Sequence, residues 1–251
     1  MNVTFLGTGA AMPTGDRFQS GLLLQGTGVE PLLVDCGSGV LHALERTDIG
    51  YEAVSTILLT HHHPDHVDDL IAILVARWLS GEPDATIVGP PGTTDLFDRL
   101  LDVHDHLRDR LSPEIREVDP GTFELCGYAI EATQTVHSAY CLAYRFETDD
   151  ASFTFSADTE ASEAVAELAD GSAVLAHDCS FPDDVDVSNH PTPAQLGRVL
   201  ADRDIGRVYL THLYPHTEGR HAEMIASVES NFDGDVRIAH DGLTVSVCQT
   251  T

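Results

Sequence analysis

The segment of residues 60–66 carries the side chains best suited to metal chemistry. It contains the pattern H-x-H-x-D-H and follows a short apolar run. His61 and His63 are two residues apart, so their side chains point the same way in an extended segment. Asp65 and His66 come after the turn that the intervening proline forces. Imidazole and carboxylate ligands together suit zinc, and suit manganese or iron less well. The segment therefore predicts the start of two adjacent metal sites.

Further ligand types stand at the ends of predicted strands later in the chain. One histidine lies in the break between two strands, one aspartate follows the next strand, and another histidine follows a late strand: His137, Asp158 and His212. Strand ends on one edge of a sheet sandwich converge in space. With the ligands of residues 60–66, the set becomes five histidines and two aspartates. That number is sufficient for two metals with one bridging carboxylate.

Two other residues are candidates for supporting roles. Asp35 ends a predicted strand beside glycines, where a carboxylate can orient a metal-bound histidine, although a turn or capping role fits equally well. His190 precedes Thr192-Pro193-Ala194-Gln195. There the threonine fits an N-cap, the proline the first helical position and the glutamine the partner in a capping box. We expect His190 just outside a helix N-terminus whose free N–H groups favour an anion. A surface-loop histidine is the alternative.

The composition limits the class of protein. A chain of 251 residues with 42 % hydrophobic content can bury one large core,. Strands come first and alternate with helices later, so we expect one domain over residues 1–251, with two sheets face to face and helices outside. The five cysteines are scattered without a C-x-x-C pair, and the start of the chain does not resemble a signal peptide, which together predict a reduced cytoplasmic protein,. The most apolar stretch is too short to span a bilayer.

The charge balance is extreme. All 13 basic residues are arginines, against 41 acidic residues, and the formal charge is −28. Such a surface favours a halophilic source, where carboxylates hold hydration and salt screens self-repulsion. An ordinary acidic protein from a low-salt organism is the alternative. The same charge disfavours a broad basic face for nucleic acid.

The ordered set of ligands resembles the metallo-β-lactamase superfamily over essentially the whole chain. The resemblance rests on H-x-H-x-D-H, then a lone histidine, then the aspartate of Ser-Ala-Asp-Thr, then the histidine of Leu-Thr-His. It implies a mixed α/β fold, the four-layer αββα sandwich, and a site for two zinc ions, with manganese or iron as alternatives. A histidine rather than a glutamate at position 63 favours hydrolysis over di-iron redox chemistry. The implied ligands are His61, His63 and His137 for one metal, Asp65, His66 and His212 for the other, and Asp158 as the bridge.

Other phrases resemble the ribonuclease Z and cyclic phosphodiesterase branch. They are Val34-Asp35-Cys36-Gly37, the run from His137 to Tyr144-Arg145, and His177-Asp178-Cys179-Ser180 followed by Asn189-His190. The resemblance implies that His190 protonates the leaving group. We expect a water shared by the two metals to attack phosphorus as hydroxide, with Asp65 orienting it or accepting its proton. Asp35 and Asp178 are predicted to support the site from behind its ligands.

The spacing between two ligands narrows the substrate. His137 and Asp158 are 21 residues apart, and two predicted strands fill that interval. The resemblance implies that ribonuclease Z enzymes of the common type carry a long arm that grips tRNA in this interval. No such arm fits here, so a small or cyclic phosphodiester is favoured as the partner and RNA is disfavoured. A tRNA 3′-processing endoribonuclease, a lactone, thioester or β-lactam hydrolase, and a non-catalytic interaction protein are the alternatives. The family also implies a homodimer.

Overall fold

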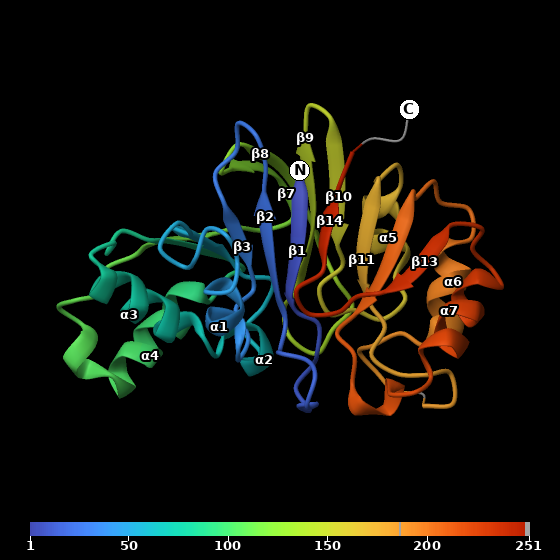
Figure 1. The fold of residues 1–251 in the computed structure, drawn as a ribbon, viewed down its shortest axis with the longest axis horizontal. Coiled ribbons are helices and arrows are strands. Elements are labelled where there is room, and N and C mark those ends of the chain that lie inside the picture. Colours follow the sequence, from blue (N-terminus) through green and yellow to red (C-terminus); the bar gives the residue numbers. More distant parts are fainter. Residues whose placement is uncertain (186, 249–251) are drawn as a thin grey trace.

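The computed structural model describes residues 1–185 and 187–248. Within these residues, two sheets of seven strands each pack face to face, and helices cover the outer faces (Figure 1). None of the helices described here has the length and apolar character needed to cross a membrane.

The first sheet contains the N-terminal strands and the last strand of the chain. The N-terminal hairpins are antiparallel, and the four strands from β3 to β6 are parallel. In spatial order the strands are β14 (Thr244–Ser246), β1 (Asn2–Gly7), β2 (Gly21–Gln25), β3 (Leu32–Val34), β4 (Thr56–Leu58), β5 (Thr86–Gly89) and β6 (Glu114–Glu117).

The second sheet is built from the remaining strands. Its strands from β7 to β10 are antiparallel, and those from β10 to β13 are parallel. In spatial order they are β13 (Asp235–Ile238), β12 (Arg207–Thr211), β11 (Val174–Asp178), β10 (Ala151–Phe155), β9 (Leu142–Thr148), β8 (Tyr128–Gln134) and β7 (Gly121–Leu125).

The helices form the two outer layers. The first four belong to the first sheet and the last three to the second, and Figure 1 shows the two groups on opposite sides of the molecule. They are α1 (Val40–Leu44), α2 (Pro64–Val67), α3 (Leu70–Ser80), α4 (Thr93–Val103), α5 (Glu163–Ala169), α6 (Pro193–Leu200) and α7 (His221–Glu229). Short 3₁₀ turns occupy Asp105–Leu107 and Pro215–Thr217.

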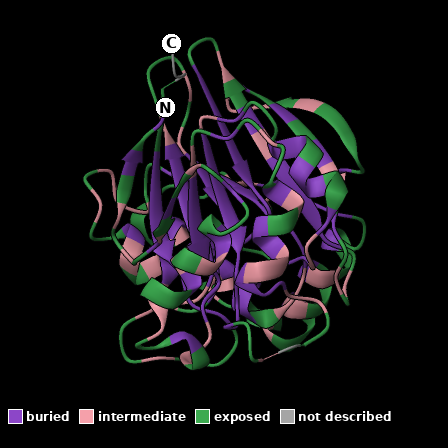
Figure 2. Ribbon diagram, turned by 90° about the vertical axis from the view of Figure 1, so that its right-hand side faces the viewer, coloured by how far each residue is buried: buried purple, intermediate pink, exposed green. Residues whose placement is uncertain are grey.

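The central strands of each sheet are buried on both faces, which is why four layers form. Neighbouring residues in a strand point to opposite faces. Leu22 and Leu24 of β2 accordingly join the apolar core between the sheets, whereas Leu23 joins the core beneath the helices of the first sheet. A third core, with Leu210 and Met224, lies between the second sheet and its helices. Figure 2 shows this as buried strands and helices with exposed outer faces. The predicted αββα sandwich is confirmed.

Candidate metal centre

The H-x-H-x-D-H segment changes conformation midway, and this directs its ligands to two places. His61 and His63 lie in the extended chain after β4, and His63 forms the N-cap of α2. Asp65 and His66 lie in the first turn of that helix. The turn predicted at the proline is therefore the start of a helix, because a proline needs no N–H at the first helical position,. One short segment thus supplies ligands from both a strand end and a helix.

The first group of ligands comprises His61, His63, His137 and Asp158, whose ligand atoms lie within 4.8 Å of one another. Nε2 of His137 is 3.2 Å from Nδ1 of His63. Oδ2 of Asp158 is 3.8 Å from Nε2 of His61 and 3.7 Å from Nε2 of His137. Four side chains from three separate parts of the sequence therefore converge on one point.

The second group comprises Asp65, His66 and His212. Nε2 of His212 is 3.2 Å from Oδ2 of Asp65 and 3.4 Å from Nε2 of His66. The other oxygen of Asp158, Oδ1, lies 3.3 Å from His66 and 3.4 Å from His212. The two oxygens of Asp158 therefore face different groups, as a bridging carboxylate requires.

The spacing of these atoms fits bound metal ions. Tetrahedral zinc with bonds of 2.0–2.1 Å places two ligand atoms about 3.3 Å apart. Six of the separations between ligand atoms lie between 3.2 and 3.9 Å, and all of them lie within 4.8 Å. Nε2 of His61 and Oδ1 of Asp158 are buried and make no hydrogen bond within the described part of the chain. The two His/Asp groups together have the ligands and the spacing of a dinuclear metal site.

The charges of the site also favour cations. Burial strongly lowers the pKa of His61, with help from the nearby His66, so its imidazole is neutral and free to coordinate. Burial would raise the pKa of Asp158, but the neighbouring His212 and His66 outweigh it and hold this pKa well below its usual range. Burial likewise disfavours charge on His66, yet Asp158 and Asp35 raise its pKa. The carboxylates thus attract positive charge to the point where the ligand atoms meet.

The comparisons with known proteins agree with this geometry. A family model described as Anti-Pycsar protein Apyc1 matches residues 1–226. The chain belongs to this family. Ribonuclease Z of Mycobacterium avium (strain 104) is 32 % identical over 270 residues, covering 96 % of each chain. The crystal structure of the metallo-β-lactamase fold protein YhfI from Bacillus subtilis matches with a TM-score of 0.83 and 25 % identity, over 97 % of this chain and 98 % of that one.

A solved diphosphatase of the PhnP family has the same fold, with a TM-score of 0.74, 20 % identity and coverage of 99 % of both chains. These relatives and the His/Asp groups together identify the protein as a metal-dependent hydrolase of the metallo-β-lactamase fold.

In this hydrolase, Asp35 lies behind both metal groups. It is fully buried and has a φ of 59°, a left-handed conformation at the end of β3. Its Oδ2 accepts a hydrogen bond from Nδ1 of His66 at 2.7 Å, and its Oδ1 accepts from the Thr60 N–H at 2.8 Å. The Thr60 hydroxyl lies 2.9 Å from Asp35 Oδ2 and 3.0 Å from Nδ1 of His61. One carboxylate thereby directs Nε2 of His66 and, through Thr60, Nε2 of His61 toward the metal positions.

Asp178 has the matching place on the second sheet. Its Oδ1 accepts from the Ser180 hydroxyl at 2.6 Å, and Ser180 Oγ lies 2.9 Å from Nδ1 of His212. The other oxygen of Asp178, Oδ2, is 2.7 Å from Nδ1 of His190. Burial alone would lower the pKa of His190, but Asp178 dominates and raises it to about 9. Asp178 therefore orients one ligand through a serine and holds a charged histidine beside the site.

The helix start near His190 differs from expectation in one respect. The capping box of Thr192 and Gln195 is confirmed. The expectation of free N–H groups is wrong, because Ala194 donates to Oδ1 of Asp183 at 2.8 Å and Gln195 donates to the Thr192 hydroxyl. Proline at the first position has no N–H. The chain's own carboxylate therefore takes the place at this terminus that an anionic ligand would need.

Sequence reasoning missed three polar side chains near the centre. Thr60 directly precedes the first ligand, and Ser180 lies in the His-Asp-Cys-Ser phrase. Tyr214 follows His212 by two residues, and its ring centroid lies 5.9 Å from those of both His190 and His212. A hydroxyl side chain within two residues of a ligand or of a supporting carboxylate is the signal that could have identified all three.

Proposed function

We propose that this chain hydrolyses small or cyclic phosphodiesters at a dinuclear zinc site. The observation that carries the proposal is the pairing of His190 with Asp178 beside the two metal groups. The imidazole stacks at 5.3 Å on His212, and its Nδ1 is engaged by the buried carboxylate. Nε2 is the nitrogen left to donate a proton, and a charged proton donor beside a dinuclear site suits the departure of an alkoxide from phosphorus.

The two metal ions would activate the attacking water and neutralise charge on the phosphoryl oxygens. Asp65 orients that water and accepts its proton. Burial opposes ionisation of Asp65, but the hydrogen bond from His212 and the charge of His66 outweigh it and lower the pKa of Asp65, which keeps it a carboxylate. As the new P–O bond forms, the bond to the leaving oxygen breaks, and His190 transfers its Nε2 proton to that oxygen.

Tyr214 supplies a hydrogen bond to a phosphoryl oxygen in this scheme. Its ring stacks on Phe181 with centroids 4.6 Å apart and is half-buried beside His190 and His212. Burial, and then the charges of Asp65, Asp158 and Asp178, raise the pKa of Tyr214 to about 12. The phenol therefore remains a donor across the working pH range. Tyr214 thus supplies the hydrogen bond to the phosphoryl group that the N-terminus of α6 cannot provide.

Zinc is the metal we propose, because a site with five imidazoles and near-tetrahedral spacing suits it better than manganese or iron. The substrate is small because β9 and β10 form a direct hairpin between His137 and Asp158. The second candidate is tRNA 3′ processing, which the likeness to ribonuclease Z favours. A net charge of −28 opposes it,. By family resemblance we also propose a cytoplasmic homodimer.

One screen tests the proposal. Protein loaded with zinc or with manganese is offered bis-p-nitrophenyl phosphate, 2′,3′-cyclic nucleotides, a lactone and a pre-tRNA. We expect turnover of the first two substrates and loss of turnover of the cyclic nucleotides in His190→Ala with metal content intact. Turnover of the lactone alone, or cleavage of the pre-tRNA alone, would replace the proposed function with the corresponding alternative.

A further inference from the structure

Asn189 connects a metal ligand to the residue that donates the proton. Its carbonyl oxygen lies 3.3 Å from Nδ1 of His137, which can donate to it. Its N–H donates to Oε1 of Glu160 at 3.0 Å. The residue has a φ of 74°, in the left-handed region. Both polar groups of one peptide segment are thus engaged immediately before His190.

Glu160 lies close to the ligands of the first metal group. It follows the bridging Asp158 by two residues, and its own N–H donates to the carbonyl of Val136 at 2.9 Å. Val136 directly precedes His137. The backbone of Glu160 is therefore fixed beside two ligands of the first metal group, while its carboxylate reaches the segment that carries His190.

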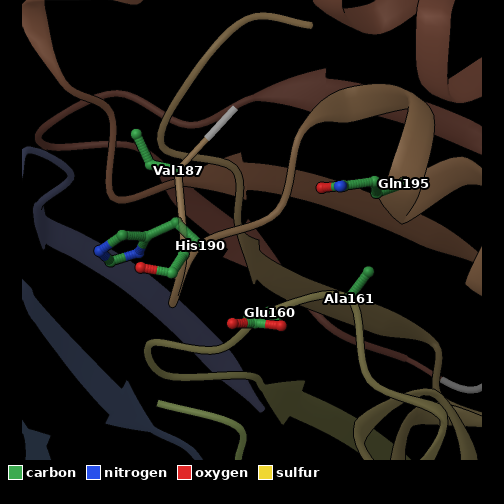
Figure 3. A pocket seen from close by; sticks show the side chains of 6 residues that line it. Glu160, Ala161, Val187, His190 and Gln195 are labelled. Atoms are coloured by element: carbon green, nitrogen blue, oxygen red, sulfur yellow. The ribbon is translucent and has the colours of Figure 1, made fainter. Parts of the chain in front are cut away.

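A hollow borders that segment on one side. It has a volume of about 450 Å³, and Figure 3 shows Val187 and His190 along one side of the hollow and Ala161 and Gln195 along the other. Glu160 also lines this space. Beside this hollow, the hydrogen bonds made by Asn189 help to fix the backbone before His190.

We propose that Glu160 is a positioning residue that, through Asn189, couples metal binding at His137 to the placement of His190. When Nε2 of His137 binds a metal, its Nδ1 carries the proton and donates to the Asn189 carbonyl. Glu160 holds the other side of the same residue, so the peptide is fixed from both sides. Coupling of this kind is reciprocal, so a change that loosens the backbone before His190 must also weaken metal binding at His137. The inference rests on the proposed function only in its assignment of the acid to His190.

Glu160 allows a matched pair of substitutions. Glu160→Gln retains a side-chain oxygen that accepts from the Asn189 N–H, whereas Glu160→Ala removes the acceptor. Ser180→Ala serves as the comparison for zinc affinity at the second metal group only, because Ser180 contacts His212 and also His190, but not His137. Glu163→Gln, on an exposed side chain, is the surface control.

Two measurements do not require turnover. Competition with a chelator resolves the two zinc equivalents, and the one lost in His63→Ala identifies the first group. We expect Glu160→Ala to lower the affinity for the zinc of the first group about 10-fold and Ser180→Ala to lower the affinity for the other zinc. Glu160→Gln should resemble the wild type. Amide exchange of Asn189, followed by NMR, should slow on zinc binding in the wild type and in Glu160→Gln but not in Glu160→Ala.

Turnover of a cyclic nucleotide gives the third readout. Glu160→Ala should lower kcat about 10-fold with KM changed less than about 2-fold, because a misplaced acid affects the chemical step more than binding. Zinc affinities and Asn189 exchange in Glu160→Ala equal to wild type would overturn the proposal, and so would a Glu160→Gln variant as defective as Glu160→Ala. If the wild type hydrolyses no phosphodiester but the zinc and exchange effects appear, the coupling holds and the proposed function fails.

Discussion

The hydrogen bond between Asp178 and His190 makes a sharp prediction about pH dependence. At 2.7 Å, in a pocket where the His190 side chain is 12 % exposed, the carboxylate raises the pKa of His190 from 6.5 to about 9. That rise corresponds to about 3 kcal/mol in favour of the protonated imidazole. Asp178→Asn keeps an oxygen in place for the hydrogen bond but removes the charge. Burial then favours the neutral form, and the pKa should return to about 6.5 or below.

The acid must be protonated to act, so the direction of the change is fixed. With a pKa near 9, about three quarters of His190 is protonated at pH 8.5, against about 1 % with a pKa near 6.5,. We therefore expect kcat of Asp178→Asn for a 2′,3′-cyclic nucleotide to fall about 75-fold at pH 8.5 and by much less at pH 6. The alkaline limb of the kcat profile should move to lower pH.

The choice of leaving group supplies the control. The ribose oxygen of a cyclic nucleotide leaves as a strongly basic alkoxide that needs a proton, whereas p-nitrophenolate is a stable anion. Profiles of kcat from pH 5.5 to 10 with both substrates separate loss of the acid from general damage. The assignment of His190 as the acid is refuted by an unmoved alkaline limb for the cyclic nucleotide, or by equal losses for bis-p-nitrophenyl phosphate.

Four further predictions concern the metals, the phosphoryl group and salt. Asp158→Ala removes a ligand from both groups and should reduce bound zinc from about two to below one per chain by elemental analysis; retention of two would contradict the bridging role. Thr60→Val removes the hydroxyl behind His61 at nearly constant volume and should lower zinc affinity about 10-fold in chelator competition. Unchanged affinity would exclude a role for the contact from Asp35 through Thr60 to His61. Tyr214→Phe keeps the aromatic stack and should weaken inorganic phosphate binding to the zinc-loaded protein about 10-fold, whereas the matched Tyr140→Phe should not; equal effects would argue against a specific contact. The free energy of unfolding should rise between 0.1 M and molar salt if the acidic surface reflects a halophilic source, and equal stability would remove that hypothesis.

The sequence alone determined the features that depend on local order. The sequence shows which residue types could bind a metal and in which order they occur. The spacing of His61, His63, Asp65 and His66, and the places of the later ligands after predicted strands, follow from it directly. The capping box at Thr192 is equally local and is confirmed. The continuous apolar runs at residues 22–24, 32–34 and 57–59 are typical of strands covered on both faces, in keeping with sheets that carry helices outside,.

The tertiary structure decided how those residues interact. The division of the two oxygens of Asp158 between the metal groups depends on the packing of the two sheets, which no spacing in the sequence specifies. The hydrogen bond from Ala194 to Asp183 reversed an expectation that was sound for an isolated helix. Such contacts join residues distant in the chain, and their geometry is set within tenths of an ångström by the fold. The sequence specified which groups could bind metals, and the fold specified which nitrogen or oxygen of each faces them.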